Sequence, residues 1–410
     1  MISLRRTQHP VGQGFFHTAE LGLHGGSSPW FRWLYDCGEY RSHHDARDRE
    51  IGSVIRDWGV GGAVDVAFIS HADSDHINGF EGLFLSGKGL KPRAIMMPQI
   101  TAIERLVSWC AAVEEGGVTS AFYDAFIANP RRAIASAFGD VQVIEVVPRG
   151  DENFSNFDDA PIDVASDGLP AWRVVGPAGD DQSGRPVIQS GSQIRVQAAW
   201  TSGYPWVLVP HVAAEITGLR KDFIKALAAG MKISERRLEE RIHDPLYVAS
   251  LLKTQGTKLR AAYRDASPSV NATTLSLYAG PVEEMNGRHQ IHYGGRRIRP
   301  TERSGRIGWL GTGDAELTGD RLQDFLDVFD QYFLYVKTVT TPHHGSARNR
   351  VPALWEALGP DVTAISAADP PKKWNHPSTV VLHDLARHGI MHLIVSSAPR
   401  SRVDEFVHYN

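Results

Sequence analysis

Short apolar runs alternate with amphipathic segments along the first part of the chain. The runs "GAVDVAFIS", "PRAIMMP" and "VQVIEVVP" are nearly continuous in apolar residues, which is typical of strands covered on both faces. The segments 100–117 and 119–139 lie between them and repeat their apolar residues at helical spacing. This strand–helix alternation predicts an α/β fold.

The pattern changes between about residues 213 and 265. This stretch has helical spacing and many Lys, Arg and Glu, and the strand-like runs "ATTLSLYAGP", "RIGWLGTGD" and "LYVKTVTTP" follow it. We therefore expect a single domain over 1–410 that carries a helical insertion at 213–265. The acidic, turn-rich stretch 149–170 predicts a surface loop.

Composition narrows the class of protein. Of 410 residues, 42% are hydrophobic and 22% are charged, as in ordinary globular proteins. The two cysteines, Cys37 and Cys110, exclude a disulfide framework and fit a reducing compartment. No apolar run reaches the length needed to cross a bilayer, so we expect a cytoplasmic protein without a membrane partner. The net charge of −4 gives no global attraction to nucleic acid.

Four metal-capable side chains follow the run "GAVDVAFIS" directly. The sequence "HADSDH" places His71, Asp73, Asp75 and His76 within six residues at a predicted strand end. Two imidazoles and two carboxylates in this order suit a pair of divalent cations better than a protein core. The alternative is a polar loop that caps the next helix, with Asp75 as the N-cap.

Three later strand ends carry further candidate ligands. Asp314 follows "GWLGTG", the pair His343–His344 precedes Gly345 and Ser346, and His376 precedes Pro377. In open α/β sheets, sites gather at the carboxyl ends of strands. Each residue alone could be a cap or a packed side chain, but their joint occurrence in this order indicates one site.

The order HxDxDH, TGD, HHGS and HPS resembles the metallo-β-lactamase fold. More narrowly, it is similar to the nuclease-like domain at the C-terminus of ComEC/Rec2 DNA-uptake proteins. The segments "VGQG", "LYDCGE", "WRVVGP" and "SVNATTLSLY" resemble further strands of that family. The resemblance implies a four-layer αβ/βα sandwich, with Asp36 behind the metal site and Asp314 shared between two metal ions.

The donor set also bears on metal identity and on roles. Asp73 stands where a metallo-β-lactamase usually has histidine, so the site is oxygen-rich and favours Mn²⁺ or Mg²⁺, with Zn²⁺ also open. The expected metal ligands are His71, Asp73, Asp75, His76, Asp314 and His343, and the expected catalytic residues are Asp75, His344 and His376. The sequence leaves open which histidine of the pair His343–His344 binds metal.

Two cations about 3.5–4 Å apart would generate hydroxide from bound water at neutral pH and would neutralise an anionic substrate. Both effects suit phosphodiester cleavage. Ser346 could contact a phosphate, although a simple turn fits equally well. The segment 286–306 is rich in arginine, and we expect Arg296, Arg297 and Arg299 to contact DNA phosphates. The alternative for this segment is a solvated hairpin.

Three functions remain in competition. The first is a metal-dependent phosphodiesterase, a nuclease acting on DNA. The second is a phosphoesterase for a small molecule. The third is a protein that binds a partner through 213–265 and carries a degenerate metal site, and the intact set of metal-capable residues argues against it.

Overall fold

The structure is a computed structural model of the chain. It describes residues 1–410 except 1, 27–28, 41–42, 86, 115–118, 151–161, 164–171, 181–183, 197–205, 214–216, 267–272, 300–301, 370–374 and 410. Side chains are also left undescribed at 162–163, 217–219 and 302–303. Most of the predicted surface loop 149–170 and the start of "SVNATTLSLY" therefore lie outside the described residues.

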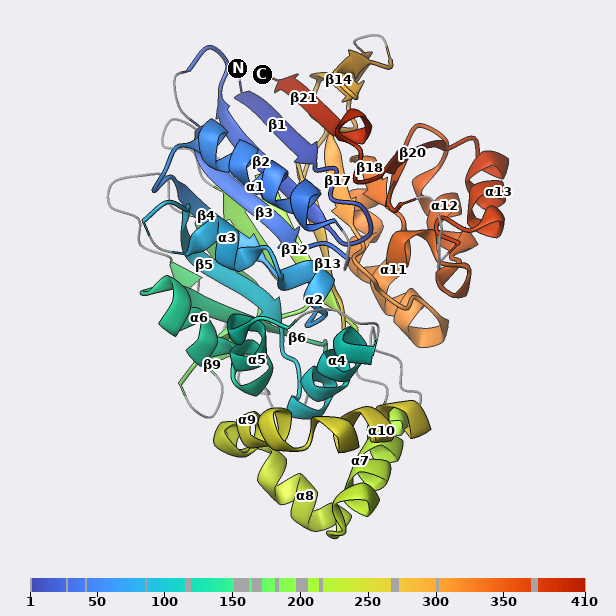
Figure 1. Ribbon diagram of the computed structural model, residues 1–410. Coiled ribbons are helices and arrows are strands. Elements are labelled where there is room, and N and C mark those ends of the chain that lie inside the picture. The colour runs from blue at the N-terminus through green and yellow to red at the C-terminus, as the bar shows by residue number, and fades with distance from the viewer. Residues whose placement is uncertain are drawn as a thin grey trace.

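Two mixed β-sheets form the centre of the molecule (Figure 1). Among the described residues, the larger sheet has twelve strands in the order β15-β14-β21-β1-β2-β3-β4-β5-β6-β10-β9, with β16 paired to β14. Its strands are β1 Ile2–Gln8, β2 Phe16–Leu23, β3 Pro29–Cys37, β4 Ala63–Phe68, β5 Lys91–Pro98, β6 Gln142–Val147, β9 Ala178–Asp180, β10 Pro186–Gln189, β14 Gly287–Tyr293, β15 Arg296–Arg297, β16 Glu302–Ser304 and β21 Val403–Tyr409.

The smaller sheet has nine strands over the described ranges, in the order β20-β19-β18-β17-β13-β12-β11-β8-β7. Its strands are β7 Ile162–Asp163, β8 Trp172–Val175, β11 Gln193–Val196, β12 Trp206–Val212, β13 Leu275–Gly280, β17 Gly308–Gly311, β18 Val336–Thr340, β19 Thr363–Ala367 and β20 Met391–Val395. Strands β3 to β6 run parallel in the larger sheet, and strands β17 to β20 run parallel in the smaller one.

Helices cover the outer face of each sheet (Figure 1). The larger sheet carries α1 His44–Trp58, α2 Ser74–Ile77, α3 Phe80–Phe84, α4 Ala102–Glu114, α5 Ala121–Ala128 and α6 Pro130–Phe138. The smaller sheet carries α11 Gly319–Phe333, α12 Pro352–Leu358 and α13 Thr379–Arg387. Short 3₁₀ turns are η2 Pro342–Gly345, η3 Ala347–Asn349 and η4 Pro399–Ser401.

Apolar side chains fill the spaces between these layers and form distinct cores. Between the two sheets, Trp33 of β3 and Trp206 of β12 are fully buried, with their ring centroids 6.3 Å apart. Aromatic pairs of this kind add about 0.5–1.5 kcal/mol to the stabilisation from burial alone. Separate apolar clusters lie beneath the helices on each outer face. The layers therefore form the four-layer αβ/βα sandwich that the resemblance implies, which is the architecture of the metallo-β-lactamase fold.

Four further helices lie between β12 and β13 along the chain and form the lower end of the molecule in Figure 1. They are α7 Thr217–Met231, α8 Glu235–Ile242, α9 Pro245–Thr254 and α10 Gly256–Ala266. We call these four helices, residues 217–266, the helical lobe. No helix in the described part of the chain is both long enough and apolar enough to span a membrane.

A proline divides one predicted helix into two. The sequence indicates a single helix within 119–139, but the structure has two, α5 and α6, which meet at Asn129. Pro130 cannot continue a helix from its preceding turn, whereas it suits the first position of a new one. The Asn129 side chain accepts a hydrogen bond from the backbone N–H of Arg132 and so caps α6.

Candidate metal centre

Both sheets contribute side chains to one cluster, at the carboxyl ends of their parallel strands. His71 follows β4 of the larger sheet, and Asp36 lies near the end of β3 beside it. Asp314 follows β17 of the smaller sheet, and the pair His343–His344 follows β18. The sandwich thus brings together residues that are more than 240 positions apart in sequence, at the edge where α/β sheets gather ligands.

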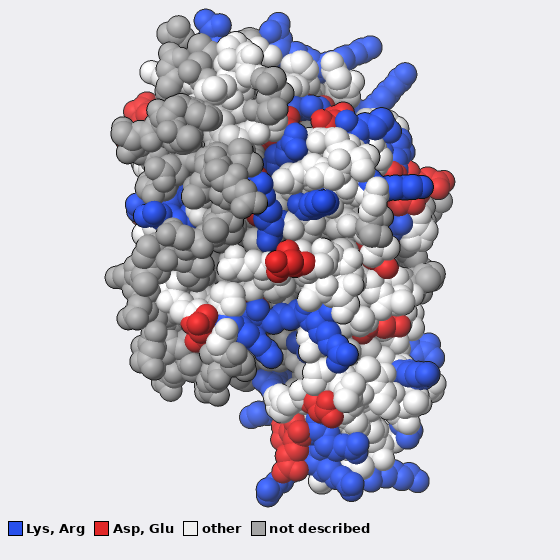
Figure 2. All heavy atoms as spheres, turned by 90° about the vertical axis from the view of Figure 1, so that its left-hand side faces the viewer, with Lys and Arg blue, Asp and Glu red and all other residues white. Residues whose placement is uncertain are grey.

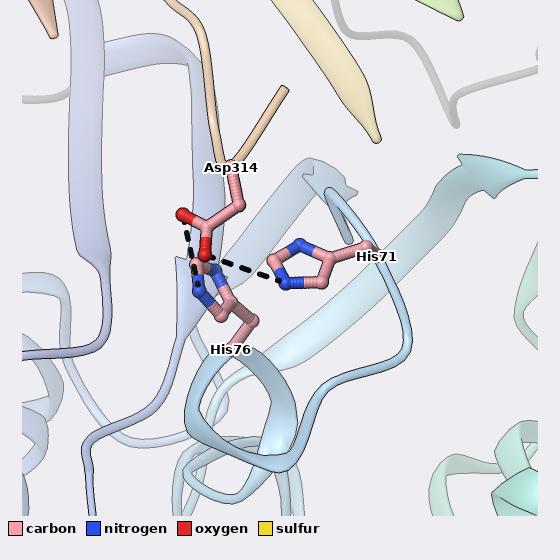
Figure 3. A group of neighbouring side chains, drawn as sticks. All are labelled: His71, His76 and Asp314. Atoms are coloured by element: carbon pink, nitrogen blue, oxygen red, sulfur yellow. Dashed lines mark ion pairs between the residues drawn. The ribbon is translucent and has the colours of Figure 1, made fainter. Parts of the chain in front are cut away.

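Asp314 is the centre of the cluster (Figure 3). Its Oδ1 atom lies 3.8 Å from Nε2 of His76 and 3.4 Å from Nε2 of His344. Its Oδ2 atom lies 3.9 Å from Nε2 of His71 and 3.6 Å from Nε2 of His343. Each carboxylate oxygen therefore faces a different pair of imidazoles.

Two groups of potential ligand atoms share this space. His71, His76 and Asp314 form one group, and Asp75, His76 and His344 form the other; in each group the atoms lie within 4.8 Å of one another. Asp73 extends the first group, because its Oδ2 lies 3.6 Å from Nε2 of His71. Ligand atoms about 2.1 Å from one cation are separated by roughly 3–4 Å. The residues present fit divalent metal ions by this measure.

The N-cap alternative for Asp75 does not hold. Helix α2 begins at Ser74, and its N-cap residue is Asp73, whose side chain makes no capping hydrogen bond. Asp75 lies inside α2, with its Oδ2 3.9 Å from Nε2 of His76. Both carboxylates of "HADSDH" are thus turned to the imidazoles and not to the helix end.

Asp36 and Ser70 orient two of the imidazoles from behind. Asp36 accepts hydrogen bonds from the backbone N–H and the hydroxyl of Ser70, at 2.7 and 2.6 Å, and from Nδ1 of His76 at 2.7 Å. The Ser70 hydroxyl, having donated its proton to Asp36, accepts from Nδ1 of His71 at 2.8 Å. With the proton on Nδ1, each ring turns the lone pair of Nε2 towards the cluster.

Those inward-facing atoms have no hydrogen-bond partner. Nε2 of His71, Nε2 of His76 and Oδ1 of Asp73 are buried, and none finds a donor or acceptor among the described residues. Buried polar atoms are normally paired, so the unpaired Nε2 atoms of His71 and His76, grouped with Asp314, indicate a cation site.

Two loops at the cluster require unusual backbone conformations. His343 and His344 both have left-handed backbones, with φ of 47° and 56°, and the backbone N–H of His343 donates to the carbonyl of Gly313 at 3.0 Å. Such conformations are costly for residues other than glycine and concentrate at functional sites. At Gly313 (φ 52°), a Cβ would lie 2.7 Å from the Tyr35 hydroxyl, so only glycine fits there.

The electrostatics of Asp314 and His344 depend on burial and on each other. Burial by itself would raise the pKa of Asp314, but the four surrounding imidazoles outweigh it and hold this pKa well below its ordinary value. Burial lowers the pKa of His344 to about 3. Asp314 is therefore an anion and His344 a neutral imidazole at physiological pH, which are the states that bind metal ions.

Asp75 and His76 show the complementary effect. Burial raises the pKa of Asp75 to about 6, with the neighbouring carboxylates adding to the rise. Burial lowers the pKa of His76, but the carboxylates of Asp36, Asp75 and Asp314 outweigh it and raise this pKa to about 10. The negative field around His76 attracts a proton in the absence of a stronger cation, and a divalent metal ion would replace that proton.

His343 and His376 lie at the rim of the cluster. The His343 side chain is 30% exposed, whereas that of His344 is 3% exposed. The rings of His343 and His376 are 5.8 Å apart, and Pro377 packs under Gly345, next in the chain to His344. His344 is thus buried beside Asp75 and His76, while His343 and His376 are only partly buried.

Of the other predicted substrate-binding residues, Ser346 lies two positions after His344, and the three arginines lie apart from the cluster. The Ser346 hydroxyl accepts a hydrogen bond from the backbone N–H of Arg348 at 3.3 Å and so caps η3. Arg296 and Arg297 form β15 at the edge of the larger sheet, and Arg299 contacts the Met391 sulfur at 3.4 Å through Nε. From β14, which pairs with β15, four strand spacings lead to β3, or roughly 19 Å along the sheet.

Ser70 is the residue of the site that sequence reasoning missed. Its position directly before His71, at the end of a buried strand, was the available signal. A serine at a strand end has many structural uses, so the signal alone could not assign it. Its contacts with Asp36, His71 and His76 appear only when β3 and β4 pair.

Comparisons with known proteins add little to this geometry. No protein-family model matches the chain, and no curated protein matches it. Among solved structures, the chain is similar to a long form RNase Z from yeast, with a TM-score of 0.26 and 8% sequence identity. The similarity covers 83% of this chain and 32% of the yeast chain, so this chain spans about a third of that protein. The class is therefore defined by the sandwich itself: a metallo-β-lactamase-type fold with a His/Asp cluster at its strand ends.

Proposed function

We propose that this protein is a metal-dependent phosphodiesterase that cleaves nucleic acid, with DNA as the expected substrate. The proposal depends on the position of Asp314. Its two carboxylate oxygens face two different sets of imidazoles. A shared carboxylate between two ligand groups is the arrangement of two-metal phosphodiester hydrolysis. The motif order that resembles the ComEC/Rec2 nuclease-like domain supports the same substrate class.

The residues divide between two cation positions. His71, Asp73 and Asp314 would hold the first ion, and Asp75, His76, His344 and Asp314 would hold the second. Bound divalent ions would supply hydroxide at neutral pH and neutralise charge on the phosphate. The three carboxylates favour Mn²⁺, with Zn²⁺ and Mg²⁺ as the other candidates.

From the sequence, His343 was the expected metal ligand and His344 the expected catalytic residue. We propose the opposite assignment. His344 is buried and lies with Asp75 and His76, so it is the metal ligand in this proposal. His343 is more exposed and close to His376, so these two imidazoles face the substrate. Either could donate a hydrogen bond from its ring to a phosphate oxygen, or give a proton to the leaving oxygen.

The proposal extends to the organisation of the chain. The αβ/βα sandwich is one catalytic domain over 1–410, and the helical segment 213–265 is an insertion within it. Both free cysteines are buried, which agrees with a cytoplasmic protein. Arg296, Arg297 and Arg299 are proposed to touch the nucleic-acid backbone at a distance from the cleaved bond, because they lie at the edge of the same sheet.

A substrate panel tests the proposal. The metal-free protein is reconstituted with Mn²⁺, Mg²⁺ or Zn²⁺ and assayed on plasmid DNA, single-stranded DNA, RNA and bis-p-nitrophenyl phosphate. We expect cleavage of nucleic acid and of the small diester with at least one metal, and none after chelation. Hydrolysis of bis-p-nitrophenyl phosphate without cleavage of any nucleic acid would favour a small-molecule phosphoesterase. Inactivity on all phosphoesters with every metal would overturn the proposal.

A further inference from the structure

The helical lobe differs in charge from the rest of the molecule. Residues 217–266 contain eleven Lys and Arg against six Asp and Glu, a net charge of +5, whereas the whole chain has −4. The remainder of the chain therefore carries −9. In Figure 2 basic side chains are prominent on the lobe at the lower end of the molecule, with a few acidic ones among them. A positive lobe on an acidic body creates a local field for anions that the net charge conceals.

Some of these cations have structural partners. Arg260 and Arg264 form ion pairs with Glu114 of α4, at 3.7 and 3.4 Å, and so tie the lobe to the sandwich. Arg236 pairs with Glu240 at 2.9 Å. The guanidinium of Arg241 lies 4.0 Å from the ring centroid of Tyr247. These four arginines are accounted for by the fold of the lobe.

Six other cations of the lobe are exposed and unpaired. They lie on α7, on α8, at the end of α9, on α10 and just beyond α7, and none forms an ion pair with another described residue. They are Lys221, Lys225, Lys232, Arg237, Lys253 and Lys258. Lys221 and Lys225 are four positions apart on α7, so they project from the same face of that helix. Unpaired cations held on rigid helices are free to meet an external anion.

The lobe is fixed beside the metal centre. Its buried residues, such as Phe223, Leu251 and Leu259, belong to the same apolar cluster as the residues under α4 and α5. Helices α9 and α10 pack on α5 and α4, respectively. In α5, the hydroxyl of Tyr123 donates to the backbone carbonyl of Ala72, between His71 and Asp73, at 2.9 Å. The lobe is therefore packed on the helices α4 and α5, and α5 contacts the loop that carries His71 and Asp73.

We propose that the helical lobe is the docking surface for the sugar–phosphate backbone of the nucleic-acid substrate. This inference rests on the proposed nuclease function and assigns the part of the protein that holds the substrate outside the metal centre. A nucleic acid fits better than a protein partner, because Leu246 is the one large hydrophobic side chain that is exposed among the lobe's described residues. Stable protein interfaces need an apolar centre, whereas backbone binding needs spaced cations.

Charge neutralisation tests the inference. The triple variant Lys221→Gln/Lys225→Gln/Lys232→Gln is compared with a control of equal charge change, Arg56→Gln/Lys88→Gln/Lys91→Gln. The control residues are exposed and lie near the amino ends of β4 and β5, opposite to the metal centre. Binding of fluorescein-labelled DNA duplex, single-stranded DNA and RNA is titrated from low to high salt on metal-free protein. Melting temperatures confirm that each variant folds.

We expect the lobe variant to raise the Kd about tenfold or more and to lower the salt dependence by about one ion for each phosphate that the lobe no longer neutralises, with the control near wild type. Equal binding by the lobe variant and wild type would overturn the role of the lobe and leave the proposed nuclease function in place. Equal weakening by both triple variants would show a general charge effect and also overturn it. Absence of nucleic-acid binding by wild type, with intact hydrolysis of bis-p-nitrophenyl phosphate, would instead remove nucleic acid from the proposed function.

Discussion

The imidazole of His76 donates through Nδ1 to the carboxylate of Asp36, at 2.7 Å, while its Nε2 faces Asp314. Both side chains are completely buried. Asp36 has a left-handed backbone with φ of 55°, a conformation that residues other than glycine seldom adopt and that concentrates at functional sites. The contact fixes which nitrogen of His76 is free, and that free Nε2 is the atom that would bind a metal ion in the proposed function.

Removal of this support should weaken metal binding without removing a ligand. We expect Asp36→Asn to lower the affinity for divalent metal about 10- to 100-fold, because the amide can no longer fix the protonated Nδ1 and the ring orientation together. Isothermal titration of metal-free protein measures the change. The control Asp65→Asn removes a carboxylate at the start of the neighbouring strand β4, where it accepts from Arg32 and Arg93. Unchanged affinity in Asp36→Asn would contradict the positioning role.

Loss of a metal ligand should stop the reaction and spare the fold. We expect Asp75→Ala to lower turnover of bis-p-nitrophenyl phosphate by about 10³-fold or more, since bound metal supplies several kcal/mol of stabilisation to the transition state. Circular dichroism and melting temperature should remain near wild type, because α2 is a short turn beside a large core. The control Asp140→Ala removes an exposed carboxylate and should be neutral. Normal turnover in Asp75→Ala would refute the assignment.

The two adjacent histidines should separate in a metal assay. His344→Ala should lower the bound metal by about one equivalent, because this imidazole lies with Asp75 and His76. His343→Ala should retain both equivalents and lose turnover, since its ring is partly exposed and is proposed to contact the substrate. Metal content by mass spectrometry, together with the rate on the small diester, checks both. The reverse pattern would show that His343 is the ligand, as expected from the sequence.

A buried ion pair away from the metal centre should dominate stability. Arg6 donates to both oxygens of Glu405, at 2.9 and 2.8 Å, and His289 and Thr338 also contact Glu405, at 2.7 Å each. These residues come from both sheets. We expect Glu405→Gln to lower the free energy of unfolding by about 3–5 kcal/mol, because it leaves Arg6 buried without its counter-charge. The partly exposed Glu20, which pairs with Arg32 at 3.7 Å, offers a control, and Glu20→Gln should cost less than about 1 kcal/mol.

The same pair predicts a pH dependence. Burial alone would raise the pKa of Glu405, but Arg6 and His289 outweigh it and hold this pKa well below the ordinary 4.5. A lowered pKa in the folded state gives stability that is complete above pH 4.5 and decreases as the pH falls towards the folded value. Urea unfolding of wild type and Glu405→Gln should therefore converge at acid pH. A constant difference from about pH 7 to about pH 3 would contradict this.

The strand-end positions of the site could be predicted from the sequence, because apolar runs stop directly before His71 and Asp314. Strand–helix alternation likewise indicated an α/β fold, and the resemblance carried by the order of motifs implied the four-layer sandwich. These features depend on local periodicity, which a single sequence displays. The pairing of the two sheets, which brings Asp314 to His71, depended on the resemblance and not on periodicity.

The remaining features depend on tertiary contacts. Left-handed backbones, as at Asp36, His343 and His344, are uncommon outside glycine, and the sequence pattern does not show where they occur. His289 lies within the arginine-rich segment, for which a solvated hairpin was the alternative to DNA contact, yet it is buried against Glu405. Sequence alone shows neither partner, since they are 116 positions apart.

The central claim is that two cations, bound around Asp314, carry phosphodiester hydrolysis. The most direct measurement is a titration of metal-free protein with Mn²⁺, in which bound metal and hydrolysis of bis-p-nitrophenyl phosphate are followed together. The account predicts that activity is absent without metal, rises with binding and reaches its maximum near two equivalents per chain. Full activity in the metal-free protein, or saturation with two equivalents and no hydrolysis of any phosphodiester, would contradict it.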